Sequence, residues 1–196
     1  MLVSRSSMEL TRLLGPWSST LTSLALCSIT YSKEKLHRDN VAHSNVLRGL
    51  KRLGSLRHLY LFEAISNYFK QIAYQLELPQ TIIRQLDSLV LSGINRTSQI
   101  DRLSQKIAQL KPAGLSCRLS VAPIRRIVPE LTEMLSRESH SHFASLTTHL
   151  STFVTEMDQI APICRVFTSL RYLKLTSLIT VRLKTLSIGR GLFHSF

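Results

Sequence analysis

The spacing of apolar residues along the chain predicts a succession of helices. In the clearest case, residues 143–160, six apolar side chains recur at intervals of three and four, mostly with serine, threonine, histidine and glutamate between them. That spacing places one apolar stripe on the side of a helix. Residues 56–76 show a similar spacing, and Pro79 follows at a point where a proline would end a helix.

Shorter segments share this pattern, and several begin near a serine, threonine, asparagine or aspartate that can cap a helix. They lie at about 20–35, 46–53, 81–91, 98–110, 123–135 and 166–186. The last segment also alternates apolar with basic residues between Leu173 and Lys184, and this alternation would suit a strand. We find no strand–turn–strand series and no repeat at a fixed period. The first two of these shorter segments can also form one continuous helix. The predicted fold class is therefore all-α, an irregular antiparallel helical bundle of six to seven helices.

The expected domain organisation is a single helical domain. It covers residues 18–188, between a flexible N-terminus at 1–17 and a flexible C-terminus at 189–196, and the best candidate for an internal break is 112–121. Residues 13–32 contain no charged residue, but hydroxyl side chains interrupt their apolar run. A membrane-spanning helix needs about 20 mostly apolar residues. We therefore expect a buried helix there, and a membrane as an unlikely partner.

The charge of the chain points to a polyanionic partner. Its 196 residues include 25 lysines and arginines but only 12 aspartates and glutamates, a net charge of +13. Residues 35–57 carry a net +5 and residues 159–196 a net +6. Charge gathered in two places is typical of nucleic-acid binding. On the predicted helices, Arg48, Lys51 and Arg52 would share one face. The candidates for nucleic-acid contact are Lys35, His37, Arg38, Arg48, Lys51, Arg52, Arg57, Arg171 and Lys174.

No motif in the chain indicates catalysis or a cofactor. The glycine-rich phosphate loops, the two-histidine zinc motif and the strand–serine–helix motif of hydrolases do not occur. His140, His142 and His149 form the only histidine cluster, and no further ligand accompanies them. We therefore predict a protein that is not an enzyme and that has no catalytic residues, no metal, no cofactor and no small-molecule substrate.

Two segments resemble a known family. Tyr31–Arg38 followed by Leu47–Leu53, and then Phe143–Met157, are similar to helices of the small RNA-binding protein subunit of RNase MRP and of the related nucleolus and neural progenitor protein. The resemblance implies a non-catalytic subunit of a nucleolar ribonucleoprotein that processes precursor ribosomal RNA. Its partners would be a structured RNA and other ribonucleoprotein subunits. The implied RNA contacts are Lys35, His37, Arg38, Lys51 and Arg52.

Two other functions fit the same sequence. In the first, residues 1 to about 33 are a cleaved presequence, and the protein is a helical structural subunit of a mitochondrial assembly. In the second, the protein is a helical interaction module, and the apolar stripe at 143–160 binds a partner helix. The expected location is the nucleus and nucleolus, with the mitochondrion as the alternative.

Overall fold

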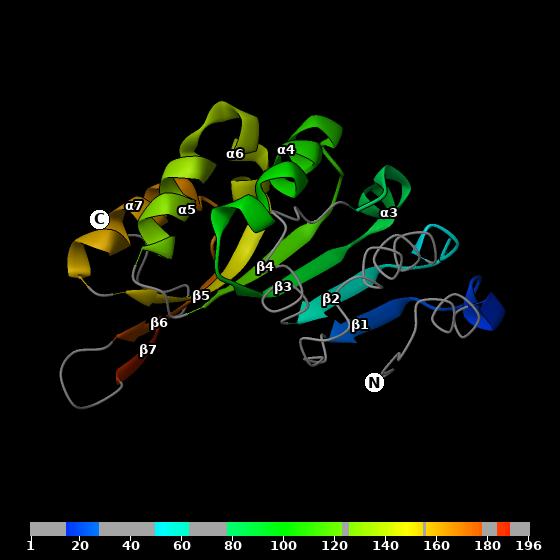
Figure 1. Ribbon diagram of the computed structural model, residues 1–196, viewed down its shortest axis with the longest axis horizontal. Helices are drawn as coiled ribbons and strands as arrows, with labels where there is room; N and C mark the ends of the chain where they lie inside the picture. Colours follow the sequence, from blue (N-terminus) through cyan, green and yellow to red (C-terminus); the bar gives the residue numbers. More distant parts are fainter. Residues whose placement is uncertain are drawn as a thin grey trace, which may run out of the picture.

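The centre of the molecule is a sheet of seven strands that lie side by side in the order of the sequence (Figure 1). The structure is a computed structural model that describes residues 15–27, 50–62, 78–122, 126–154, 156–177 and 184–188. The first six strands are parallel, and β7 (Lys184–Ile188) pairs with β6 in the antiparallel direction. These six are β1 (Ser23–Cys27), β2 (His58–Phe62), β3 (Ser88–Ile94), β4 (Ser116–Val121), β5 (Thr147–Val154) and β6 (Tyr172–Ser177).

All described α-helices lie on one face of this sheet (Figure 1). They are α3 (Gln80–Gln85), α4 (Asp101–Leu110), α5 (Ile127–Ser136), α6 (Glu138–Leu146) and α7 (Ile160–Val166), with short 3₁₀ turns η1 (Gly15–Trp17), η3 (Thr97–Gln99) and η4 (Met157–Gln159). Connections between parallel strands are right-handed almost without exception. When every connection has the same hand and the strand order always advances in one direction, every helix reaches the same face. The layers are therefore one sheet and one layer of helices.

The predicted all-α bundle is wrong, because the described part of the chain is an α/β fold. The apolar stripe at 143–160 is divided between α6, which ends at Leu146, and strand β5. The predicted helix at 56–76 contains β2, while residues 63–77 lie outside the described part. The helix predicted at 98–110 is confirmed from residue 101 onward by α4, and the helix predicted at 123–135 is confirmed from residue 127 onward by α5, since residues 123–125 lie outside the described part.

The helix predicted at 166–186 is also replaced largely by a strand. Helix α7 ends at Val166, and strand β6 then occupies residues 172–177. The alternation of apolar and basic residues was therefore the informative signal. β4 occupies most of the segment considered for an internal break, and it is hydrogen-bonded to β3 and to β5.

A leucine repeat that the sequence analysis missed underlies the sheet. The pattern Leu-x-x-Leu-x-Leu begins at positions 21, 56, 86 and 170, and its last two leucines always lie in a strand. Strand pairing sets them side by side, as in Leu24, Leu59 and Leu89. Successive partners along this inner row are separated by 23 to 35 residues, so no fixed period exists. A strand-plus-helix unit that stacks on its neighbours in this way is characteristic of leucine-rich solenoids.

The core lies between the sheet and the helices. Inward leucines of the strands pack against apolar residues of the helical layer, among them Ile107, Leu131 and Phe143. Cys117 takes a leucine position in β4, and burial raises the pKa of its thiol to about 12. It is therefore a neutral, compact member of the core.

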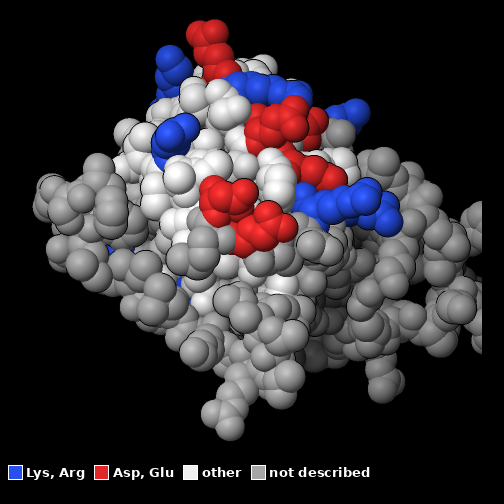
Figure 2. All heavy atoms as spheres, turned by 90° about the vertical axis from the view of Figure 1, so that its left-hand side faces the viewer, with Lys and Arg blue, Asp and Glu red and all other residues white. Residues whose placement is uncertain are grey.

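The solvent side of the helical layer carries charges of both signs. Glu133 and Arg137 form an exposed ion pair at 3.3 Å near the end of α5. Figure 2 views the molecule from its α5 and α7 end and shows acidic side chains beside basic ones. The helical layer is thus a mixed surface rather than a basic one.

Candidate functional site: the open face of the sheet

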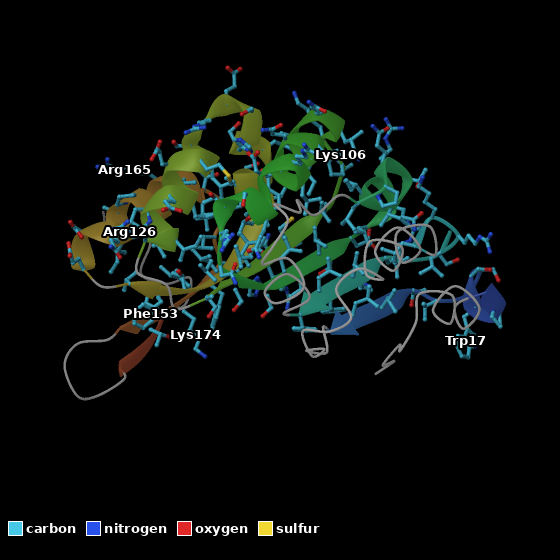
Figure 3. All side chains as sticks on the ribbon, in the orientation of Figure 1. Trp17, Lys106, Arg126, Phe153, Arg165 and Lys174 are labelled. Carbon is cyan, nitrogen blue, oxygen red and sulfur yellow. The ribbon has the colours of Figure 1, made fainter. Side chains whose placement is uncertain are left out.

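The face of the sheet that the described helices leave uncovered is the candidate site, and we call it the open face. Side chains alternate between the two faces of a strand, so the residues between the inward leucines lie here. In Figure 3, Phe153 and Lys174 project from the side of the sheet opposite to the helices, whereas Lys106, Arg126 and Arg165 lie on the helical side. The open face comprises Ser23, Ala25, His58, Tyr60, Phe62, Ser88, Val90, Ser92, Ser116, Arg118, Ser120, His149, Ser151, Phe153, Tyr172, Lys174 and Thr176.

The strand register arranges these residues in rows that cross the sheet. One row reads Ala25, Tyr60, Val90, Arg118, His149 and Tyr172. The next row has Phe62 at one side, three serines on β3, β4 and β5, and Lys174 at the other side. Bulky and aromatic side chains of the first row therefore run beside short hydroxyl side chains of the second.

Aromatic rings form a pair at each side of this surface. The rings of Tyr60 and Phe62 are stacked, with centroids 6.2 Å apart and planes within 9°. On the other side, the His149 and Tyr172 rings lie 5.7 Å apart and are tilted by 32°. Phe62 and Tyr172 are 37% and 38% exposed, which leaves large apolar surfaces in contact with solvent. Exposed aromatic rings on a rigid surface are common anchors for a binding partner.

Carboxylates are absent from the open face in the part of the chain that the structure describes. Arg118 and Lys174 are both exposed there. The described acids lie instead on the helices, in the segment after β5 or just before β3: Asp87, Asp101, Glu130, Glu133, Glu138, Glu156 and Asp158. The open face is therefore positively charged, in contrast to the mixed helical layer.

His149 lies at the most basic point of this face. Burial lowers the pKa of its imidazole, and the positive charges of Arg118 and Arg171 lower it further. The ring is held from behind, because His149 Nδ1 is 2.9 Å from Thr148 Oγ1, which is in turn 2.8 Å from Ser116 Oγ. Nε2 forms no hydrogen bond to any described residue, so this ring nitrogen is left for a ligand.

The predicted nucleic-acid contacts are separated by the sheet. Lys35, His37, Arg38 and Arg48 lie outside the described residues. Lys51 and Arg52 lie in a turn rather than on a helix, so the predicted shared helical face is not formed there. Arg57 precedes β2, and its Nη1 donates a hydrogen bond of 2.8 Å to the carbonyl oxygen of Gln85.

Arg171 and Lys174 are four strands away, at β6. Neighbouring strands are about 4.8 Å apart, which puts the two basic groups roughly 19 Å from each other along the sheet. Contact of either group with RNA stays a prediction.

A serine–histidine–aspartate arrangement lies on the opposite side, within the helical layer. Ser104 Oγ is 2.7 Å from His140 Nδ1, and His140 Nε2 is 3.3 Å from Asp101 Oδ1. A nucleophile must reach a substrate, yet Ser104 is 0% exposed and His140 is 2% exposed. The arrangement therefore joins α4 to α6 and supports the core. Burial lowers the pKa of His140, which keeps the ring neutral at pH 7.

The sequence analysis missed most of the open face. Arg118, His149 and Tyr172 were not selected for it, because a helical reading of their segments assigns them to unrelated faces. A signal for this face is the residue between the last two leucines of each repeat, which is Ala25, Tyr60, Val90 or Lys174. Arg118 takes the same place between Cys117 and Leu119, whereas His149 and Tyr172 lie just before an inward leucine of their strands. Among the described residues, no group of three histidine, cysteine or acidic side chains is arranged to hold a metal ion.

The fold and this surface together define a class, an α/β protein whose parallel strands follow the order of the sequence and whose described helices all lie on one face of the sheet. Comparison of the chain with family models, with curated proteins and with solved structures gives no match. Among the helices that the structure describes, none combines the length and the apolar character needed to cross a membrane.

Proposed function

We propose that this protein is a recognition scaffold that binds a partner protein on its open face. The observation that carries the proposal is a sheet of six parallel strands whose described helices all lie on one side and whose other side presents exposed aromatic and basic side chains. Solenoids of this kind present extended surfaces for binding, because each repeat adds one strand to the same face.

The composition of the open face supports a protein as the partner. Tyrosine, phenylalanine and arginine are enriched in the cores of protein interfaces, whereas aspartate and glutamate are depleted. Tyrosine combined with serine is the pairing that antibody binding sites use, since tyrosine supplies rigid contact area and serine supplies adaptable hydrogen bonds. On the open face, Tyr60 and Tyr172 lie in the row next to the one that holds the serines of β3, β4 and β5.

The dimensions favour an extended segment of the partner. The row from Phe62 to Lys174 crosses five strands, a span of about 19 Å at the usual strand spacing. About six residues of extended chain cover that length. The serine hydroxyls along the row can bond to the backbone of such a segment, and the aromatic pairs can contact its side chains.

We propose RNA binding as the second candidate, as a subunit of a nucleolar ribonucleoprotein. The net charge of +13 and the basic open face favour it. Single-stranded RNA stacks its bases on aromatic side chains and bonds its phosphates to basic ones. We place it second because the strands of the open face supply only Arg118 and Lys174 as lysine or arginine side chains among the described residues.

Site-specific photocrosslinking separates the two candidates. A photoreactive phenylalanine analogue is placed at Tyr172 on the open face and, as a control, at Arg84 on α3, and the full-length protein is irradiated in cells. The proposal predicts protease-sensitive adducts of defined mass from position 172 only. Adducts that a ribonuclease removes would establish the RNA candidate, and equal yields from both positions would refute the open face as the binding surface.

A charge-reversal pair tests the same surface without a crosslinker. In Arg118→Glu/Lys174→Glu, the adduct from position 172 should fall at least tenfold. Arg84→Glu/Arg165→Glu changes the net charge by the same amount on the exposed helical side, and it should leave the adduct unchanged. Equal losses in both pairs would mean that overall charge, rather than the open face, governs binding.

A further inference from the structure

Positive charge converges on His149, and no carboxylate of the residues that the structure describes lies on this face to balance it. Register places Arg118 directly beside His149 on the neighbouring strand, and Tyr172 beside it on the other side. Arg171 immediately precedes Tyr172, and its backbone N–H donates a 2.8 Å hydrogen bond to the carbonyl oxygen of Thr148, next to His149. Neither guanidinium forms an ion pair among the described residues. Like charges that face one another repel unless an anion lies between them.

We propose that Arg118, His149 and Arg171 form a site for a phosphate monoester, and that a phosphorylated residue of the partner protein occupies it. The inference rests on the proposed function, because it specifies which group of the bound segment lies at the β4–β6 side of the open face. Two guanidinium groups and one imidazole suit a phosphate better than a single carboxylate. A phosphate monoester presents three acceptor oxygens and up to two negative charges.

The contacts behind His149 allow its ring to act in either protonation state. When the neutral ring carries its proton on Nε2, the Thr148 hydroxyl donates to Nδ1 and the Nε2 proton points away from the threonine. In the protonated ring, Nδ1–H donates to the Thr148 oxygen instead. The threonine hydroxyl then turns to the carbonyl oxygen of Cys117, at 3.4 Å. Nε2–H is a donor to the ligand in both states, so the relay prepares the site for an anion.

Anion binding should consequently be coupled to uptake of one proton by His149. The neighbouring arginines and burial hold the pKa of the free imidazole low. A bound phosphate offsets the arginine charges and adds its own attraction, so it raises the pKa of His149. By linkage, the affinity for the dianionic form of the phosphate increases as the pH falls from the pKa of His149 in the complex toward its pKa in the free protein. Tyr172 adds a ring on which the side chain bearing the phosphate can pack.

The test uses the full-length protein with labelled histidine, observed by NMR, and it requires no partner. Inorganic phosphate and phenyl phosphate are titrated in separately. The His149 resonances should shift saturably at millimolar concentration, more strongly with phenyl phosphate, and the apparent pKa of His149 should rise at saturation. His140 is the internal control, because it is buried in the helical layer and should not respond.

Matched variants assign the effect to the two arginines. Arg118→Gln and Arg171→Gln should each weaken phenyl phosphate binding at least fivefold. Arg84→Gln and Arg165→Gln, which remove the same charge on the helical side, should leave it unchanged. The absence of a saturable shift at His149, or an equal weakening in all four variants, would overturn the proposal.

Two further outcomes keep this proposal separate from the proposed function. Crosslinking through position 172 without phosphate binding would support the proposed scaffold function and refute the phosphate site. Phosphate binding without crosslinking would support the phosphate site and refute the proposed scaffold function. If decauridylate binds more than tenfold more tightly than phenyl phosphate and shows the same dependence on Arg118 and Arg171, the ligand is RNA and the phosphorylated partner is excluded.

Discussion

A single buried hydroxyl in β5 provides a sharp test of the inward face of the sheet. Thr152 lies in the inner row beside Leu175 and is 3% exposed. Its Oγ1 atom is buried and has no hydrogen-bond partner among the described residues. A buried polar group without a partner costs about 1–3 kcal/mol. Thr152→Val removes this group and keeps both the shape and the branching of the side chain.

The expected result is a protein that is more stable by about 1–2 kcal/mol, since the relieved hydroxyl and about 0.8 kcal/mol for a buried methyl group act in the same direction. In a chain of this length, that gain raises the melting temperature by about 3–6 °C. Urea unfolding followed by circular dichroism gives the free energy of unfolding, and a thermal scan gives the melting temperature. Binding to the open face should be unaffected, because the substituted side chain points toward the helices.

The same strand offers a matched control. Thr147 is 0% exposed, but its Oγ1 donates a 3.1 Å hydrogen bond to the carbonyl oxygen of Phe143. Thr147→Val loses that bond, and we expect it to be neutral or to lower stability by up to about 1 kcal/mol. The reasoning is refuted if Thr152→Val is less stable than the parent protein, or if both variants gain equally.

Three other predictions follow from the described contacts. Because burial lowers the pKa of His140 in the folded state, the unfolded chain binds more protons below about pH 6.5, and the free energy of unfolding should fall between pH 7 and pH 5. Urea titrations at both pH values should show a smaller fall for a His140→Gln variant, and an equal fall would contradict this. Lys111 ends α4 with a positive φ of 43°, and Gly114 has a φ of 81°. Lys111→Gly should therefore raise the free energy of unfolding by about 0.5–1 kcal/mol and Gly114→Ala lower it by about 1 kcal/mol, and effects of the opposite sign would exclude this backbone explanation. Leu89→Ala, on the inward face of β3, should cost about 2–5 kcal/mol, whereas Val90→Ala on the open face should cost far less, and equal losses would show that the two faces are assigned incorrectly.

The elements that local pattern could predict are the helices with full amphipathic turns. Helix α4 has its buried Leu103 and Ile107 four residues apart, and Asp101 lies in its first turn. Helix α5 has the same character, and Pro129 falls in its first turn, where a proline is tolerated. In both, the residues that make the helix lie within one segment.

The strands could not be recognised in this way. In Leu-x-x-Leu-x-Leu, the first interval of three is also a helical interval, and only the last interval of two indicates a strand. In β5, threonines take two positions of the pattern, so even that interval is hidden. Irregular connections between the strands concealed the repeat as well.

The candidate site is built on the strands, so it could not be predicted once the strands had been missed. Arg118, His149 and Tyr172 are distant in the sequence, and only the pairing of β4, β5 and β6 makes them neighbours. The charge of the chain did predict an anionic partner, and an anionic ligand on the open face is still a proposal. The sequence contains no local feature that joins these three residues.

By itself, the sequence determined the abundance of leucine at short intervals, the excess of positive charge and the helices α4 and α5. The tertiary structure decided that leucines such as Leu59, Leu89 and Leu173 lie in strands, and it decided which side chains reach the open face. The physical reason is that a helix satisfies its backbone hydrogen bonds within one segment, whereas a parallel strand must find its partners in segments about 30 residues away. No single segment of the sequence indicates which strands pair, and the face opposite to the leucines exists only once the strands have paired.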